Sequence, residues 1–169
     1  EKEFRFDIAD LEALITPKTK MLIVNSPQNP TGGILTSEDI EAISALAIKH
    51  DILVFSDEIY SRVVYDGFEP FSFLQVPGMR ERTIMLDGYS KTYAMTGWRL
   101  GYGVMPKEIA SIVAKLQTNC ASCTSTFTQV AGIEALNGPQ GSVDTMVTEF
   151  KRRRDRIVEG LNSIPGFRC

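Results

Sequence analysis

The sequence predicts an α/β fold, a three-layer α-β-α arrangement around a mainly parallel sheet. Four short apolar runs have the length of β-strands, and the first three are continuously apolar, as in strands that helices cover on both faces. Segments with a helical period lie between the first two runs and after the fourth. The chain of 169 residues, 43% of them hydrophobic, is long enough for one sizeable core. The four runs are MLIVNS (21–26), ILVFSD (52–57), TIMLDG (83–88) and LGYGVM (100–105).

A helix is predicted between the first two strands. Thr36 and Asp39 have the spacing of a capping box, in which two side chains satisfy backbone N–H groups at the start of a helix. Strand, helix and strand together form a βαβ unit, which is expected to be right-handed. The apolar face of this helix consists of Ile40, Ile43, Leu46 and Ala47.

Three further helices are predicted after the fourth strand. The second of them covers residues 126–136 and ends before the turn sequence NGPQG. The third is long and amphipathic, and its basic run KRRRDR (151–156) is interpreted as a solvated helix face. The first begins after Pro106 and carries an apolar stripe of Ile109, Ile112, Val113 and Leu116.

Charge and cysteine content argue against several function classes. The net charge of −3, with both signs interspersed, gives no indication of binding to nucleic acid or an anionic membrane, and no apolar run has the length of a membrane span. Cys120, Cys123 and Cys169 do not form an even disulfide framework, and with His50 as the only histidine no metal site is expected. Buried thiols and a cytoplasmic location are expected instead. The first residue is Glu1 rather than methionine, which suggests a fragment or a processed start.

Polar residues cluster where the predicted strands end. NSPQNPTGG follows the first strand, SDEIY the second and DGYSK the third, and Arg99 stands at the start of the fourth. Because α/β sheets bind ligands at the carboxyl ends of their strands, these segments are expected to meet at one edge. Taken singly, an Asn-Pro-Thr-Gly turn or an aspartate after a strand is an ordinary structural feature. Their joint occurrence on successive strand ends indicates a functional site.

The segments NPTGG, SDEIY and GYSKTYAMTGWRLGYG resemble the large domain of pyridoxal-phosphate enzymes of fold type I, most closely the class I/II aminotransferases of the aspartate and aromatic type. The resemblance extends over nearly the whole chain. It implies that residues 1–160 form the central part of the cofactor-binding large domain and that residues 161–169 begin the small C-terminal domain. It also implies four adjacent strands with the last antiparallel, and further segments before Glu1 and after Cys169.

Three catalytic residues follow from this resemblance. Lys91 would form a Schiff base with the aldehyde of pyridoxal 5′-phosphate and move a proton between the substrate α-carbon and the cofactor. Asp57 would pair with the pyridine nitrogen and keep it protonated, so that the ring accepts electrons. Tyr60 would hydrogen-bond the ring oxygen, and a tyrosine at this position argues against the related carbon–sulfur lyases and oxoamine synthases.

The resemblance assigns cofactor binding to Asn29, Ser90 and Arg99 in addition to the three catalytic residues. Asn29 would hydrogen-bond the ring oxygen, and a cis Asn29–Pro30 bond would direct it inward. Arg99 would hold the phosphate with its fork of donors, and Ser90 would be a second phosphate donor. Gly88 stands where relatives carry a serine, which implies that phosphate binding rests more on Arg99 and Ser90.

The function implied is amino-group transfer between an amino acid and a 2-oxo acid, both small molecules. A lyase of the aminocyclopropane-carboxylate-synthase type would use the same cofactor, and aminotransferase-like domains also serve as ligand sensors in bacterial transcription regulators. A catalytically inactive remnant is a further alternative. The family implies a homodimer, and apolar surface left open where missing segments would pack favours self-association.

Overall fold

The fold contains the predicted strands and helices in the predicted order, together with two short helices, Ile8–Leu14 and Tyr89–Thr92, that were not predicted. The computed structural model describes residues 4–169. The four strands are β1 (Met21–Asn25), β2 (Leu53–Asp57), β3 (Thr83–Gly88) and β4 (Gly101–Val104). The helices are α1 (Ile8–Leu14), α2 (Ser37–Lys49), α3 (Tyr89–Thr92), α4 (Lys107–Ala121), α5 (Thr126–Asn137) and α6 (Gly141–Asn162), and two 3₁₀ turns cover Phe73–Gln75 and Thr96–Trp98.

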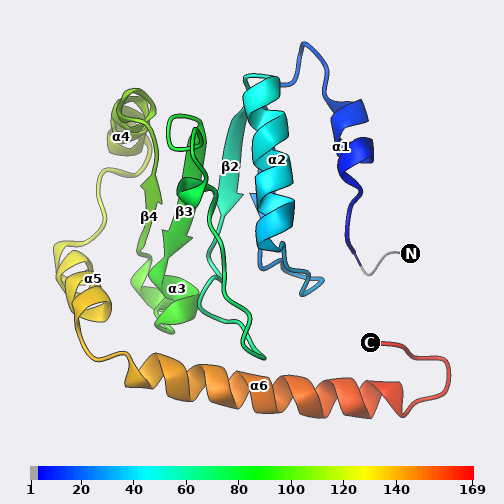
Figure 1. Cartoon of the computed structure of the whole chain (residues 1–169). Coiled ribbons are helices and arrows are strands. Elements are labelled where there is room, and N and C mark those ends of the chain that lie inside the picture. Colours follow the sequence, from blue (N-terminus) through cyan, green and yellow to red (C-terminus); the bar gives the residue numbers. More distant parts are fainter. Residues whose placement is uncertain (1–3) are drawn as a thin grey trace.

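The sheet has the order β1-β2-β3-β4 (Figure 1). The first three strands are parallel and β4 is antiparallel to β3, which confirms the α/β class and the orientation expected of the last strand. In the register of β1 and β2, Asn25 lies opposite Asp57. The last residues of these two strands are therefore neighbours, at the sheet edge where the sequence predicts the site.

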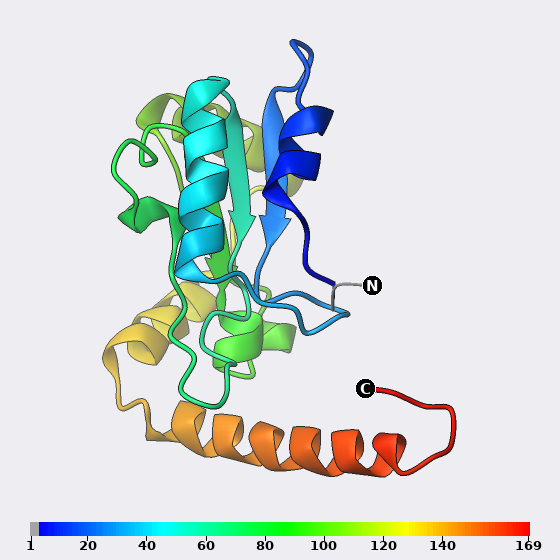
Figure 2. The same cartoon turned by 45° about the vertical axis from the view of Figure 1, so that its right-hand side comes forward.

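Helix α2 covers one face of the sheet, with α1 beside it (Figure 2). The predicted capping box is present: the Thr36 hydroxyl accepts from the Asp39 N–H, and the Asp39 carboxylate accepts from the Thr36 N–H. The apolar face predicted for this helix is buried, and it packs on Val54 of β2 in the main core cluster. Buried members of this cluster are Ile40, Ile43, Ala47, Ile52, Val54, Phe73 and Met79.

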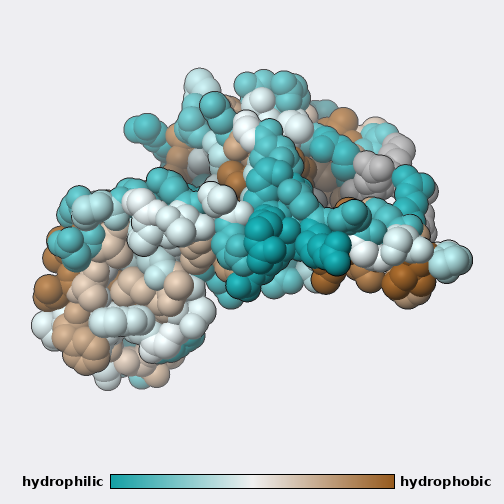
Figure 3. All heavy atoms as spheres, turned by 90° about the horizontal axis from the view of Figure 1, so that it is seen from below, coloured by the Kyte–Doolittle hydropathy of each residue, from teal (hydrophilic) through white to brown (hydrophobic). Residues whose placement is uncertain are grey.

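The opposite face of the sheet is much more open. Helix α4 lies on this side (Figures 1 and 2), yet Ile23 in the middle of β1 is 78% exposed. The stripe predicted on α4 is present but not packed, since Ile112 is 63% exposed and Leu116 58%. Seen from below, hydrophilic residues gather over the middle of α6 and more hydrophobic ones over the end of the molecule that holds α4 and α5 (Figure 3). Apolar surface is therefore exposed, as the sequence predicts.

The basic run on α6 is a solvated helix face, as predicted. Arg152 and Arg153 both pair with Glu149 on the same helix, in exposed ion pairs that stabilise little. Arg154 instead reaches the loop after β2, where it pairs with Asp66 at 2.6 Å and lies over a tyrosine ring. The run thus serves local pairing and docking of α6, and no acidic partner is needed to explain it.

The prediction that the cysteines are buried is wrong. Cys120, Cys123 and Cys169 are all exposed free thiols. The first two lie at the end of α4 and in the turn beyond it, where few side chains of the described residues pack. Within residues 4–169 no group of three or more His, Cys, Asp or Glu side chains could hold a metal ion. None of the described helices is both long and apolar enough to cross a membrane.

Candidate functional site

Asp57 ends β2 on the open face of the sheet. Side chains alternate between the two faces of a strand, and Val54 and Ser56 are buried on the α2 side. Asp57 therefore points to the opposite face, as does its register partner Asn25. One carboxylate oxygen of Asp57 accepts from the Ile59 N–H at 3.2 Å, which fixes the turn that leads to Tyr60.

The loop after β1 brings Asn29 to the Tyr60 hydroxyl. The Asn29 side-chain amide donates to the Tyr60 oxygen at 3.3 Å, across 31 residues of sequence. The Asn29–Pro30 bond is cis, as expected, and the Ser26–Pro27 bond is cis as well. Two predicted site residues from different strand ends thus meet.

Lys91 joins this pair from α3. Its ammonium nitrogen lies 5.6 Å from the centre of the Tyr60 ring. Lys91, Ser90 and Tyr60 are all partly buried. Helix α3 follows directly on β3 and so keeps Ser90 and Lys91 close to the sheet edge. The structure therefore brings an amide, a phenol and an amine together at the ends of three successive strands.

Arg99 is not part of this group. Its guanidinium donates to the Thr96 carbonyl at 2.7 Å, and its backbone is in the left-handed region with φ of 54°. It lines a separate open pocket of about 680 Å³ between α4 and α5, together with Gln117 and Thr128. In the described part of the chain this is the one hydrogen bond of the guanidinium, so most of its donors are available to an anion. Its role in phosphate binding stays a prediction.

Gly88 stands at a close approach of β3 and β4. A β-carbon added there would lie 3.1 Å from the α-carbon of Gly101 and 3.2 Å from the carbonyl oxygen of Leu100. Backbone atoms cannot swing away as a side chain can, so a serine here would require the strands to shift. The glycine noted in the sequence therefore has a packing reason.

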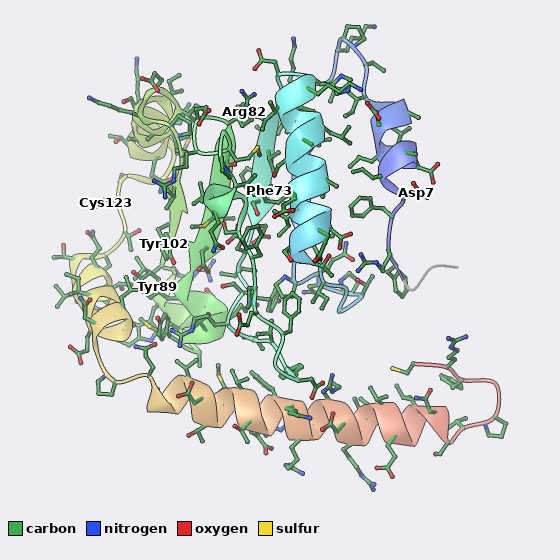
Figure 4. The ribbon with its side chains drawn as sticks, in the orientation of Figure 1. Asp7, Phe73, Arg82, Tyr89, Tyr102 and Cys123 are labelled. Atoms are coloured by element: carbon green, nitrogen blue, oxygen red, sulfur yellow. The ribbon has the colours of Figure 1, made fainter. Side chains whose placement is uncertain are left out.

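A second polar group, which was not predicted from the sequence, lies on the α2 side of the same strand ends. The Tyr102 hydroxyl donates to one oxygen of Asp87 at 3.0 Å, and the Gly88 N–H donates to the other at 2.6 Å. Burial raises the pKa of Asp87, and these two donors oppose that rise. Burial and the nearby carboxylate raise the pKa of Tyr102, whose ring meets that of Tyr89 edge-on (Figure 4). Only the β3–β4 register reveals the pairing.

Glu58, next to Asp57, provides a test of this electrostatic environment. Burial raises the pKa of Glu58, although the hydroxyls of Ser56 and Ser72 donate to it at 2.9 and 2.8 Å. A carboxyl whose pKa is raised in the folded state contributes stability that is complete below its unfolded pKa and is lost as the pH rises through the folded value. Glu58→Gln is therefore expected to gain stability relative to the wild type between about pH 4 and about pH 7.

Urea unfolding at both pH values measures this gain. The matched control is Glu69→Gln, which replaces an exposed glutamate in the following loop. A stability difference between Glu58→Gln and the wild type that is the same at both pH values would contradict the prediction.

The chemistry of the site residues fits pyridoxal phosphate. Lys91 supplies a primary amine, and Asp57 a carboxylate with one oxygen that has no hydrogen bond within residues 4–169. The Asn29 amide and the Tyr60 hydroxyl already face one another and could both contact a ring oxygen. Arg99 offers unused guanidinium donors. The candidate partners of the aldehyde, the ring nitrogen and the ring oxygen therefore lie at the strand ends, whereas Arg99, the candidate for the phosphate, lies in the separate pocket beside α4 and α5.

A pocket of about 830 Å³ opens beside Asn29 and Tyr60. Its walls are mostly apolar and include Ile34, Phe68 and Phe150, the last from α6. Arg154 also lines this pocket, but its charge is paired with Asp66. The site therefore combines two polar groups with an apolar recess.

Comparison with known proteins gives a consistent result. The family model "Aminotransferase class I and II" matches residues 1–169. An aromatic-amino-acid aminotransferase of Thermococcus litoralis is 43% identical over 97% of this chain, and an aspartate aminotransferase of Musicola paradisiaca is 42% identical over 100% of it. The solved structure of the aspartate aminotransferase from Rhizobium meliloti superposes with a TM-score of 0.95, at 40% identity and over 98% of this chain.

These matches cover only part of the relatives. The chain spans 43% of the Thermococcus protein, 42% of the Musicola protein and 42% of the Rhizobium structure.

Proposed function

Since the chain belongs to the aminotransferase class I and II family, we propose that the protein transfers the amino group of an amino acid to a 2-oxo acid and that its cofactor is pyridoxal 5′-phosphate. The observation that carries the proposal is the meeting of Asn29, Tyr60 and Lys91 at the ends of the strands. An amine held beside a phenol and an amide is suited to bind an aldehyde and to exchange protons with a bound amino acid.

Lys91 is the covalent anchor and the proton carrier. Its ammonium nitrogen lies 5.6 Å from the centre of the Tyr60 ring, which places the amine at the strand ends beside the phenol. With the cofactor bound, the Lys91 amine would be placed to take the proton from the substrate α-carbon as a general base. Such positioned proton transfer contributes roughly 10²- to 10⁴-fold to rate.

Asp57 is the residue that would contact the pyridine nitrogen of the cofactor. The bound cofactor would supply an electron sink for the charge that develops at the substrate α-carbon. The Asp57 carboxylate would keep a proton on the pyridine nitrogen, because an anion beside a protonated nitrogen favours the charged form. Its remaining lone pairs on the open face of the sheet make this contact possible.

The remaining residues orient the cofactor. The Asn29 amide and the Tyr60 hydroxyl would donate to the ring oxygen from one side. Arg99 and Ser90 would bind the phosphate, Arg99 by two parallel hydrogen bonds that a lysine cannot make. Arg99 would first have to release the Thr96 carbonyl or bind with its other nitrogen atoms.

We also propose a homodimer. The exposed apolar side chains of α4 and α5 support self-association, because contiguous apolar surface of this kind commonly marks an interface.

The test is a product analysis that separates transfer from elimination. The purified protein is incubated with pyridoxal phosphate, a single amino acid and 2-oxoglutarate, over a panel of acidic and aromatic amino acids. We expect glutamate and the 2-oxo acid derived from the amino acid to form in equal amounts. Ammonia release or a cyclised product without consumption of 2-oxoglutarate would favour the lyase. Cofactor binding without any product would favour a ligand sensor.

A further inference from the structure

We propose that Asn25 is a positioning residue of this site: its side chain sets where Asn29 stands relative to Asp57 and Tyr60. The inference rests on the proposed function for its consequence and on the hydrogen bonds of Asn25 for its basis. Asn25 opens the segment NSPQNPTGG but lies outside the NPTGG motif that predicts Asn29, and its side chain is not assigned to cofactor or substrate.

The two ends of the Asn25 amide connect two parts of the site. Its nitrogen donates to the Asp57 carbonyl at 3.2 Å, and its oxygen accepts from the Asn29 N–H at 3.1 Å. The side chain thus spans from the end of β2 to the loop that carries Asn29. Because both polar atoms of Asn25 are engaged within the protein, it acts through its neighbours.

The position of Asn29 depends on this contact. Asn29 is exposed and lies outside any helix or strand. In the part of the chain that the structure describes, the bond to Asn25 is the one hydrogen bond of the Asn29 backbone. The other links of the loop join different residues: the Gln28 N–H donates to the Gly33 carbonyl, and the Leu35 N–H donates to the Ser26 hydroxyl. These hydrogen bonds close the loop, but none of them fixes the backbone of Asn29, which among the described residues is bonded to Asn25 alone.

Loss of the Asn25 side chain would affect the two residues that it contacts unequally. The Asn29 amide reaches the Tyr60 hydroxyl at 3.3 Å, near the upper limit for a hydrogen bond, so a small shift of its backbone breaks the contact. The Asp57 carbonyl also accepts from the Ser26 N–H, so the end of β2 keeps a partner without Asn25. Loss of Asn25 is therefore expected to displace Asn29 more than Asp57.

Hydrogen exchange of the Asn29 amide tests the contact without any cofactor. Within residues 27–31 the two prolines carry no N–H, so the amides of Gln28, Asn29 and Thr31 alone report. In Asn25→Ala the Asn29 amide is expected to exchange about tenfold faster, the factor that corresponds to a hydrogen bond of ordinary net strength. The matched control is Ser26→Ala, which removes a link of the same loop and is expected to leave Asn29 unchanged.

The pH midpoint of the visible absorption of bound pyridoxal phosphate tests the consequence. Asn25→Ala is expected to move the midpoint in the same direction as Asn29→Ala. It is expected to have no further effect in an Asn29→Ala background, because a residue that acts through Asn29 has nothing left to position. Ser26→Ala is expected to keep the wild-type midpoint.

The outcomes separate this inference from the proposed function. Equal exchange at Asn29 in Asn25→Ala and the wild type overturns the inference, and so does an effect of Asn25→Ala that adds to that of Asn29→Ala. If the wild type binds no pyridoxal phosphate, the proposed function fails, and the exchange of the Asn29 amide alone decides whether Asn25 positions Asn29.

Discussion

Lys91→Ala is expected to abolish covalent attachment of pyridoxal phosphate and to lower turnover by at least about 100-fold, up to about 10⁴-fold. This range is the contribution of a positioned proton carrier to the rate. Loss of the covalent anchor is the separate effect on attachment. Alanine keeps the short helix α3, so the change is confined to the amine. Absorbance of the cofactor-loaded protein and the initial rate of 2-oxo acid formation measure the two effects.

Two variants control this prediction. Lys91→Arg keeps the positive charge, but a guanidinium is not deprotonated in proteins, so it is expected to fail like alanine. Lys107→Ala removes an exposed lysine at the start of α4 and is expected to keep both band and rate. A visible band of equal size in Lys91→Ala and the wild type would mean that other lysines react with the aldehyde, and the assignment of Lys91 would be wrong.

The sequence predicts the fold of this chain well because its signals are local. Continuous apolar runs mark β1, β2 and β3, and a capping box marks the start of α2, and each of these is found where it is expected. The order of the strands was implied by the resemblance to a family. The 3₁₀ turn at Phe73 was not predicted, because three residues leave no periodic pattern.

Burial is predicted less well than secondary structure. Thiols are among the most buried groups in proteins on average, yet all three cysteines here are exposed. The apolar stripe of α4 predicts a packed helix face, but Ile112 remains 63% exposed. Burial depends on what lies opposite a helix, and that partner is not encoded in the helix itself.

Residues of the site that lie in sequence motifs could be predicted, whereas contacts between strands could not. Motif segments identify Lys91, Tyr60 and Asn29, and the structure brings them together. The link from Asn25 to the Asp57 carbonyl and the partner of Asp87 arise from pairing across strands, which no local spacing reveals. Arg99 marks the opposite case: the sequence names it, but its side chain lies against Thr96 in a separate pocket.

Phe73→Ala is expected to lower the free energy of unfolding by about 3–5 kcal/mol, the range for removing a fully buried phenylalanine. Phe73 is 1% exposed and packs in the cluster of Ile43, Val54 and Met79 between α2 and the sheet. Truncation loses the transfer free energy of the buried ring and leaves a cavity. Val54 cannot fill this cavity unless β2 moves. Urea unfolding followed by circular dichroism measures the loss.

Phe73 is also linked to the site, because the hydroxyl of Ser72, directly before it, donates to Glu58, the neighbour of Asp57. Phe73→Leu, which retains most of the buried volume, is expected to cost less than about 1.5 kcal/mol and serves as the matched control. Loss of packing in Phe73→Ala is expected to loosen this link and to weaken pyridoxal phosphate binding, whereas Phe73→Leu keeps it. A loss of stability in Phe73→Ala no larger than that in Phe73→Leu would contradict the view that the Phe73 ring holds the Phe73–Gln75 turn in place.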